Sequence, residues 1–242
     1  AVMDFTLTEE QQMIVDSLGK YAENELKPIA QQYRDQLIPK ARMLEIQQSL
    51  VDFGVGVGVV SEELGGMGLD ALTMGLLQFE VAKVSPDLAI TSLIQMTVAK
   101  LLPLVPDHLK DDYVAPILAN QKLGCVGMSE PGAGSQITAV NCRAKLDGDD
   151  YVINGEKMWI SNGGYSDFIF LRARFNDDPV GGLGLILVDR KHGYETSDIE
   201  KMGLNRQSNA IVYFHDVRLP ASNLMVEPGK AMKALLTLLA SS

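Results

Sequence analysis

The sequence predicts an α+β protein in which an all-α N-terminal domain precedes a small antiparallel β-barrel or β-sandwich domain. Apolar residues recur at helical spacing through the first half of the chain, whereas from residue 123 short β-type runs alternate with turn residues. The 242 residues, 46% of them hydrophobic, suffice for a core in each domain. We expect an α domain over 1–122, a β domain over 123–227 and the start of a truncated C-terminal helical domain over 228–242.

The first half predicts about five helices. Thr8 followed three residues later by Gln11 is the signature of a capping box, and the helix that it opens is expected to stop at Pro28. Further segments with helical spacing are 39–53, 71–84, 89–102 and a stretch that begins at Asp107.

A glycine-rich segment between the second and third of these helices resembles a dinucleotide-binding loop only superficially. Gly54, Gly56 and Gly58 alternate, but no glycine stands at position 59 or 61, so the G-x-G-x-x-G pattern is never completed. No strand precedes the segment either. We interpret it as a connector between packed helices.

In the second half, two hairpins are expected. One crosses from "CRAKL" to "YVING" over residues 147–150, and the other turns at Asn154-Gly155, because an Asn-Gly pair between apolar runs is a strong hairpin signal. Further strands are expected at "FIFLRARF", "GLILVD" and "AIVYFHDVRL", followed by an apolar helix from Lys230.

Composition excludes several classes of function. A net charge of −10 argues against a nucleic-acid partner, which requires clustered Lys and Arg. Cys125 and Cys142 have no metal-ligand spacing and the three histidines stand far apart, so no metal site is expected. No apolar run approaches the ~18 residues that span a bilayer. The sequence predicts a cytoplasmic protein with no membrane partner.

Two motifs stand out. One is the loop "MSEPGAGS" at 128–135, which taken alone would be interpreted as a surface turn. The other is the run "MWIS" at 158–161, which taken alone would be interpreted as a strand with a tryptophan in the core. On a regular strand, however, Trp159 and Ser161 would share one face, opposite Met158 and Ile160. That face would offer an indole plane and a hydroxyl about 7 Å apart, at ~3.3 Å per residue.

These motifs, with "NGEKMWISNG" following "MSEPGAGS" by 26 residues and "FHDVRLP" beyond them, resemble the N-terminal and middle domains of the acyl-CoA dehydrogenase family. The resemblance covers essentially the whole chain. It implies FAD as cofactor, an acyl-CoA thioester as substrate, an electron-transfer flavoprotein as electron acceptor, a role in fatty acid β-oxidation, and a homodimer or homotetramer.

The resemblance also implies the site. A loop kept small by glycines brings backbone N–H groups close to a flavin, Ser129 and Ser161 stand where the family usually has Thr, and Trp159 packs against the ring. Ser135 also approaches the CoA arm of the substrate. The flavin contacts that it implies are Val126, Met128, Ser129, Gly134, Ser135, Trp159, Ile160 and Ser161.

Several positions depart from the family pattern. Gln136 replaces the usual Asp after the loop serine, and Ser61 replaces a proline of the connector. Arg206 is shifted by one position, which leaves open a phosphate contact or an ordinary surface cation. Gln95 and Met96 lie on the helix that closes the acyl pocket in relatives, so they are candidates for a chain-length role or for simple packing.

No catalytic residue is expected in this chain. Relatives supply a glutamate base from their C-terminal helical domain, and this chain ends at Ser242 before either position that matches it. The alternatives are an acyl-CoA oxidase, a flavin monooxygenase of the same fold, or a non-catalytic CoA- or flavin-binding subunit whose partner supplies the base. The acyl group and the physiological direction stay open.

Overall fold

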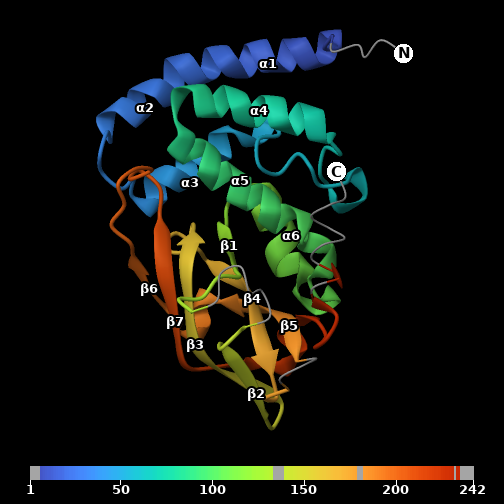
Figure 1. Cartoon of the computed structure of the whole chain (residues 1–242). Helices are drawn as coiled ribbons and strands as arrows, with labels where there is room; N and C mark the ends of the chain where they lie inside the picture. The colour runs from blue at the N-terminus through green and yellow to red at the C-terminus, as the bar shows by residue number, and fades with distance from the viewer. Residues whose placement is uncertain (1–5, 133–138, 179–181, 232, 235–242) are drawn as a thin grey trace.

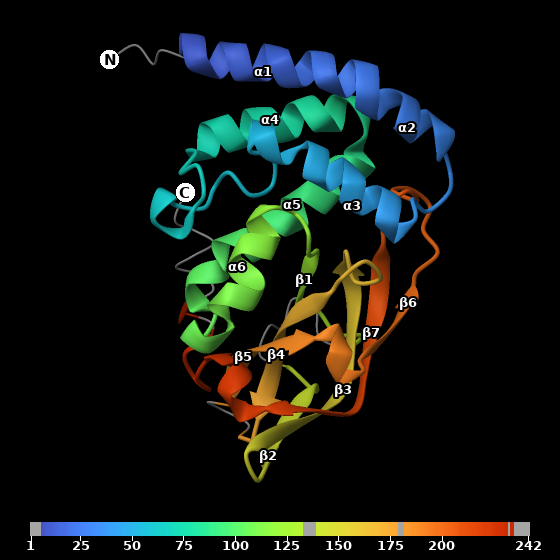
Figure 2. The same cartoon turned by 180° about the vertical axis from the view of Figure 1, so that it is seen from behind.

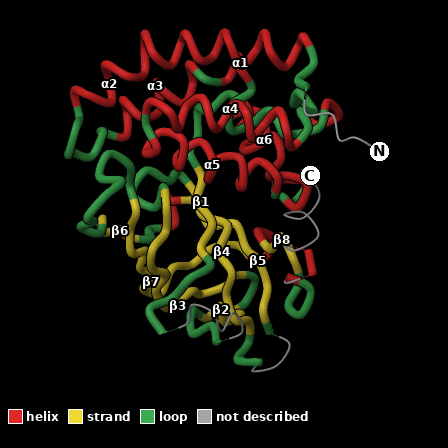
Figure 3. The backbone as a smooth tube through the Cα atoms, turned by 45° about the horizontal axis from the view of Figure 1, so that its top comes forward, coloured by secondary structure: helices red, strands yellow, loops and turns green. Residues whose placement is uncertain are grey.

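The computed structural model describes residues 6–132, 139–178, 182–231 and 233–234. Helices gather at one end of the molecule and strands at the other (Figures 1 and 3). The α-helices are α1 (Glu9–Tyr21), α2 (Lys27–Gln32), α3 (Lys40–Ser49), α4 (Ala71–Val84), α5 (Pro86–Lys100) and α6 (Lys110–Leu118). The α+β class predicted from the sequence is therefore confirmed.

The strands form one mixed sheet. They are β1 (Gly124–Gly127), β2 (Arg143–Asp147), β3 (Asp150–Ser161), β4 (Phe168–Phe175), β5 (Leu183–Asp189), β6 (Glu195–Asp198), β7 (Asn209–Pro220) and β8 (Leu224–Val226). Their order is β6-β7-β3-β2-β4-β5-β8, with β1 parallel to β4. Most pairs are antiparallel, but β2 is also parallel to β4. Between the described residues the end strands β6 and β8 do not pair, so the sheet curves without closing.

Three apolar cores hold the molecule. One lies inside the curved sheet and contains Ile169, Leu171 and Phe214. The second joins α5 and α6 to the outer face of β4 and β5. Figure 2 shows α6 alongside β5. The third lies among α1, α3, α4 and α5. Because β4 sends alternate side chains to the first two cores, this strand belongs both to the interior of the sheet and to its border with the helices.

Several local predictions are confirmed. Thr8 and Gln11 exchange both hydrogen bonds of a capping box. Helix α4 spans Ala71–Val84, as expected from its spacing. The hairpin over 147–150 joins β2 to β3, with Asp147 opposite Asp150 and Gly148 at a φ of 65°. These are cases in which neighbouring residues alone decide the backbone.

The prediction that Pro28 ends the first helix is wrong. A π-helical turn, Ala22–Leu26, follows α1, and α2 then continues to Gln32 with the proline in its first turn. The Lys27 N–H donates to the Ala22 carbonyl, five residues back. Since a π turn is wider than an α turn, it separates the proline ring from the preceding carbonyl and the helix continues.

The prediction of a hairpin at Asn154-Gly155 is also wrong, because both residues lie inside the single strand β3. The register with β7 shifts there, so β7 carries one extra residue and Asp216 adopts a φ of 50°. The Asn154 side chain accepts from the Asp216 N–H and donates to its carboxylate. Gly155, at a φ of 133°, approaches Cys142 too closely for a side chain. The Asn-Gly pair therefore marks a β-bulge.

One apolar segment is longer than the sequence suggested. Helix α5 runs into a 3-10 turn, and the combined stretch Pro86–Leu104 has 19 residues, long and apolar enough by length and composition to cross a membrane. It packs within the protein, since Leu88, Val98 and Leu101 are completely buried. A core helix and a membrane span share this composition.

Buried polar contacts tie the helices to the sheet. The Tyr165 hydroxyl donates to the Ile38 carbonyl (2.8 Å), and the Asn162 amide donates to the Thr91 carbonyl (3.1 Å). Asp87, nearly fully buried, accepts from the Arg206 guanidinium (2.9 Å) and from its backbone N–H (2.8 Å). The Arg206 Nε donates to the Ala30 carbonyl (2.8 Å). Arg206 is thus a structural tie, and neither interpretation left open by the sequence describes it.

We expect Arg206→Met to lower the free energy of unfolding by about 2–3 kcal/mol, because a hydrogen-bonded buried carboxylate loses its cationic partner. Arg143→Met is the matched control: its pair with Asp177 is 61% and 60% exposed. That pair should contribute less than about 1 kcal/mol. Urea denaturation of both variants measures the difference, and equal losses would contradict the role of Arg206.

Candidate functional site

The two motifs singled out in the sequence lie side by side. The Met158 N–H donates to the Ser129 carbonyl at 2.9 Å, so the loop after β1 is bonded to the last third of β3. Ser129 and Ser161 are both half-buried. Two segments 29 positions apart in the chain are therefore joined through their main chains, and Ser129, Trp159 and Ser161 lie within or next to them, each at least partly exposed.

Trp159 lies at a second β-bulge. The pairing with β7 shifts between Lys157, opposite Val212, and Ile160, opposite Ala210, so β3 has one extra residue. Trp159 adopts a φ of 62°, a strained value for a bulky side chain, and is 57% exposed. The bulge turns the indole away from the core.

The bulge at Trp159 means that side chains of β3 do not alternate regularly between the two faces here. Regular alternation would place Lys157 on the face of Trp159, yet Lys157 is completely buried. Ile160 also packs into the core of the sheet, so only its main chain is left for a ligand. The outward position of Trp159 was predicted, but its cause is the bulge and not the two-residue period.

A buried ion pair that the sequence did not reveal anchors the loop. Glu130, the residue after Ser129, accepts from the Lys157 Nζ at 2.6 Å, and the two side chains are 3% and 0% exposed. Its carboxylate also accepts from the N–H groups of Asn141 (2.6 Å) and Cys142 (3.2 Å). Burial lowers the pKa of Lys157, and the Glu130 carboxylate opposes that shift.

Arg172 adds a second buried cation. Its Nη2 donates to the Met128 carbonyl at 3.1 Å, while Nε and Nη1 have no partner among the described residues, although the residue is 2% exposed. Burial lowers the pKa of its guanidinium, and the Glu130 carboxylate again opposes the shift. Of these three buried side chains, two are cationic and one is anionic, a balance that favours an electron-rich ligand nearby.

The remaining predicted contacts divide into two groups. Val126 and Met128 are half-buried and pack against the core between the helices and the sheet. Gly134 and Ser135, the proposed contacts at the end of the loop, lie outside the described residues, as does Gln136.

Gln95 does not offer its side chain to a pocket. It is completely buried, donates to the Lys122 carbonyl at 2.9 Å and accepts from the Gly124 N–H at 3.1 Å. It therefore fixes the start of β1 against α5. Met96, the other candidate for a chain-length role, is half-buried on the same helix.

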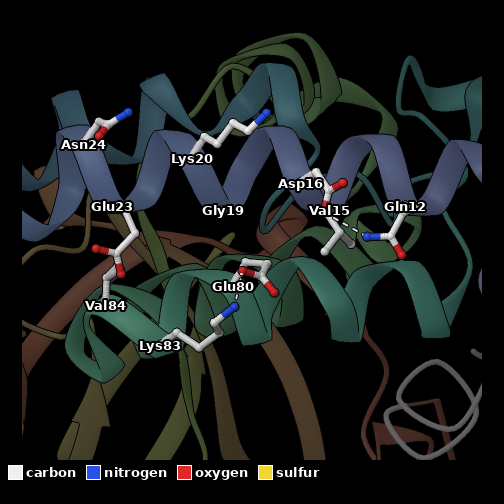
Figure 4. A pocket seen from close by; sticks show the side chains of 10 residues that line it. All are labelled: Gln12, Val15, Asp16, Gly19, Lys20, Glu23, Asn24, Glu80, Lys83 and Val84. Atoms are coloured by element: carbon white, nitrogen blue, oxygen red, sulfur yellow. Dashed lines mark hydrogen bonds and ion pairs between the residues drawn. The ribbon is translucent and has the colours of Figure 1, made fainter.

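A groove lies elsewhere, between α1 and α4 (Figure 4). It encloses about 700 Å³, and its lining includes Asp16, Lys20, Glu23, Glu80 and Lys83. Glu80 and Lys83, three residues apart on α4, form an ion pair at 2.7 Å on that side of the groove. Charges of both signs without an aromatic surface are typical of a solvated helix pair, so we place the functional site at Trp159.

Two family models match most of the chain. Residues 8–121 match "Acyl-CoA dehydrogenase, N-terminal domain", and residues 125–217 match "Acyl-CoA dehydrogenase, middle domain". The short-chain specific acyl-CoA dehydrogenase of Clostridium acetobutylicum is 30% identical over 96% of this chain. This chain covers 63% of that relative, less than two thirds of its length.

Solved structures show the same similarity. The butyryl-CoA dehydrogenase of Megasphaera elsdenii superposes with a TM-score of 0.85 at 26% identity, covering 98% of this chain and 63% of that one. A chain in a structure described as the electron transferring flavoprotein of Acidaminococcus fermentans gives a TM-score of 0.87 at 30% identity, with coverage of 98% and 63%.

Proposed function

The chain belongs to the acyl-CoA dehydrogenase family, and from this premise we propose that it binds FAD and forms the flavin-holding part of an acyl-CoA dehydrogenase. The observation that carries the proposal is the bond from the Met158 N–H to the Ser129 carbonyl (2.9 Å). It joins the loop that carries Ser129 to the residue before the exposed Trp159 on the strand that ends at Ser161.

The residues present fit an isoalloxazine. The ring has flat faces and an edge of nitrogen and oxygen acceptors, and the site offers an exposed indole plane and two hydroxyl donors. The excess positive charge of Lys157 and Arg172 over Glu130 suits a ring that becomes electron-rich. When bound, FAD supplies the hydride acceptor for oxidation of a carbon–carbon bond.

The residues of this chain bind and orient. Trp159 covers one face of the ring and excludes water from it, while Ser129 and Ser161 fix its polar edge. Glu130 braces the loop and does not serve as a base, because it is buried and already accepts from Lys157 (2.6 Å). We assign proton abstraction to no residue of this chain.

The substrate and partners of the whole protein are proposals supported by the relatives. An acyl-CoA thioester is the substrate class in the names of the relatives from Clostridium and Megasphaera. The similarity to a chain in the Acidaminococcus structure supports an electron-transfer flavoprotein as electron acceptor. We further propose a role in β-oxidation, a cytoplasmic location and assembly as a homodimer or homotetramer.

The only tryptophan of the chain gives a direct test. Titration with FAD is expected to quench the fluorescence of Trp159, because the indole stacks on the ring. The quenching should saturate with a weak affinity, and the flavin absorbance band near 450 nm should shift. ADP carries the nucleotide without the ring and should leave the emission unchanged. Equal quenching by both ligands, or none by FAD, would overturn the proposed function.

A further inference from the structure

Asn209, the first residue of β7, contacts the site without having been singled out by any motif. It lies opposite Ser161 in the register of β3 and β7. Its Nδ2 donates to the Ser161 Oγ at 3.1 Å and lies 3.5 Å from the Trp159 carbonyl oxygen. One side chain therefore touches both the hydroxyl and the bulged backbone of the proposed flavin site.

The surroundings decide which way the Asn209 amide faces. The Trp159 carbonyl oxygen is an acceptor only, so the NH₂ group and not the amide oxygen must face it. With the amide in that orientation, the Ser161 Oγ has to accept from Nδ2. The hydroxyl proton of Ser161 takes no part in this bond and is free to be donated to another group.

The amide oxygen of Asn209 supports a positioning role. It is buried, and no described residue donates a hydrogen bond to it. An unsatisfied buried acceptor lowers the stability of the fold. The amide orientation of Asn209 therefore leaves its oxygen without a described donor, while its Nδ2 donates to the Ser161 Oγ. We take the direction of the Ser161 hydroxyl to be the result of this orientation.

We propose that Asn209 is a positioning residue that holds Ser161 as a hydrogen-bond donor toward an acceptor nitrogen of oxidised FAD. The inference rests on the proposed function. Oxidised flavin presents an unprotonated acceptor at N5, whereas the reduced ring carries a proton there. A serine held as donor therefore favours the oxidised form, and loss of Asn209 frees the hydroxyl to serve either form.

A double-mutant cycle tests the inference. Asn209→Ala is expected to weaken binding of oxidised FAD about three- to tenfold, the effect of one hydrogen bond, measured by quenching of Trp159. In a Ser161→Ala background the same change should alter the affinity less than about twofold, because its target is gone. Asn209→Ala should also raise the midpoint potential of the bound flavin, a shift that a purely structural role does not produce.

Asn154→Ala is the matched control. Its amide bonds to Asp216 (2.9 Å) at the other bulge of the same strand pair, remote from Ser161, and its loss should leave FAD affinity unchanged. Asn209→Gln keeps the amide donor on a longer side chain, and partial recovery of the wild-type potential is expected.

The outcomes distinguish the positioning role of Asn209 from FAD binding by the chain. If Asn209→Ala weakens FAD equally with and without Ser161, or leaves the potential unchanged, the positioning role is wrong while the proposed function stands. If Ser161→Ala itself has no effect on affinity, the placement of Ser161 at the flavin is wrong. If the unmodified chain binds no FAD, the proposed function fails and this inference fails with it.

Discussion

Glu130→Ala is expected to destabilise the chain by about 3–5 kcal/mol, the loss that follows when one partner of a buried ion pair is removed. Lys157, completely buried, would be left without its counter-charge and hydrogen-bond acceptor. The N–H groups of Asn141 and Cys142 would lose their acceptor as well. Equilibrium denaturation in urea, analysed for its midpoint and its slope, measures the change.

The control for this variant is Glu45→Ala. Glu45 pairs with Arg42 at 2.6 Å, but the two side chains are 61% and 41% exposed, so the loss should stay below about 1 kcal/mol. If Glu130→Ala does not fold, the double variant Glu130→Leu/Lys157→Met provides the test. It removes both charges and should recover part of the stability. A loss for Glu130→Ala no larger than for Glu45→Ala would show that the buried pair does not hold the loop.

The second large effect is on ligand binding. Trp159→Ala is expected to lower the affinity for FAD by about one to two orders of magnitude, since stacking on an exposed aromatic plane contributes roughly 1–3 kcal/mol. Trp159→Phe keeps a smaller plane and should lose less. Because the fluorescent reporter is removed, binding in these variants is followed by the absorbance and emission of the flavin itself.

Trp159→Gly separates binding from folding. Glycine adopts a φ of 62° without strain, whereas other side chains lose about 1–2 kcal/mol there. We expect the glycine variant to be at least as stable as the wild type and about 1 kcal/mol more stable than Trp159→Ala, while its FAD affinity falls as far. A glycine variant that loses stability together with affinity would mean that the indole supports the fold.

The elements predicted correctly depend on residues next to each other in the chain. The capping box at Thr8 and the turn at Gly148 are decided by local hydrogen bonds and by one permissive backbone angle. Helix α4 follows from spacing alone. In each case no distant strand or helix competes with the local signal.

The wrong predictions share a different cause. Asn154-Gly155 is a strong turn signal, but the neighbouring strand β7 supplies an extra residue at Asp216, and the pair is absorbed into a bulge. At Pro28 a wider helical turn removes the clash that would have ended the helix. Both depend on a backbone adjustment that no residue preference encodes.

For the site, the sequence identified the residue types but not their partners. Ser129 and Trp159 were recognised, yet the bulge that exposes the indole arises from the register with Val212 and Ala210 on β7. Glu130 and Lys157 carried no signal, because 27 residues separate the partners of their bond. Arg206 looked like a phosphate or surface cation until its contact with Asp87, 119 residues away, was visible.

The core shared by helices and sheet has a mechanical consequence. Phe168 and Phe170 of β4 pack with Val98 of α5 and Ile117 of α6, and hydrogen bonds such as Tyr165 to Ile38 fasten the same border. A hinge between two parts of a protein needs a border with few contacts. The border between the helices and the sheet is well packed, so we expect no hinge there. Any rearrangement around a bound ligand is therefore expected in loops, while the border between helices and sheet keeps its shape.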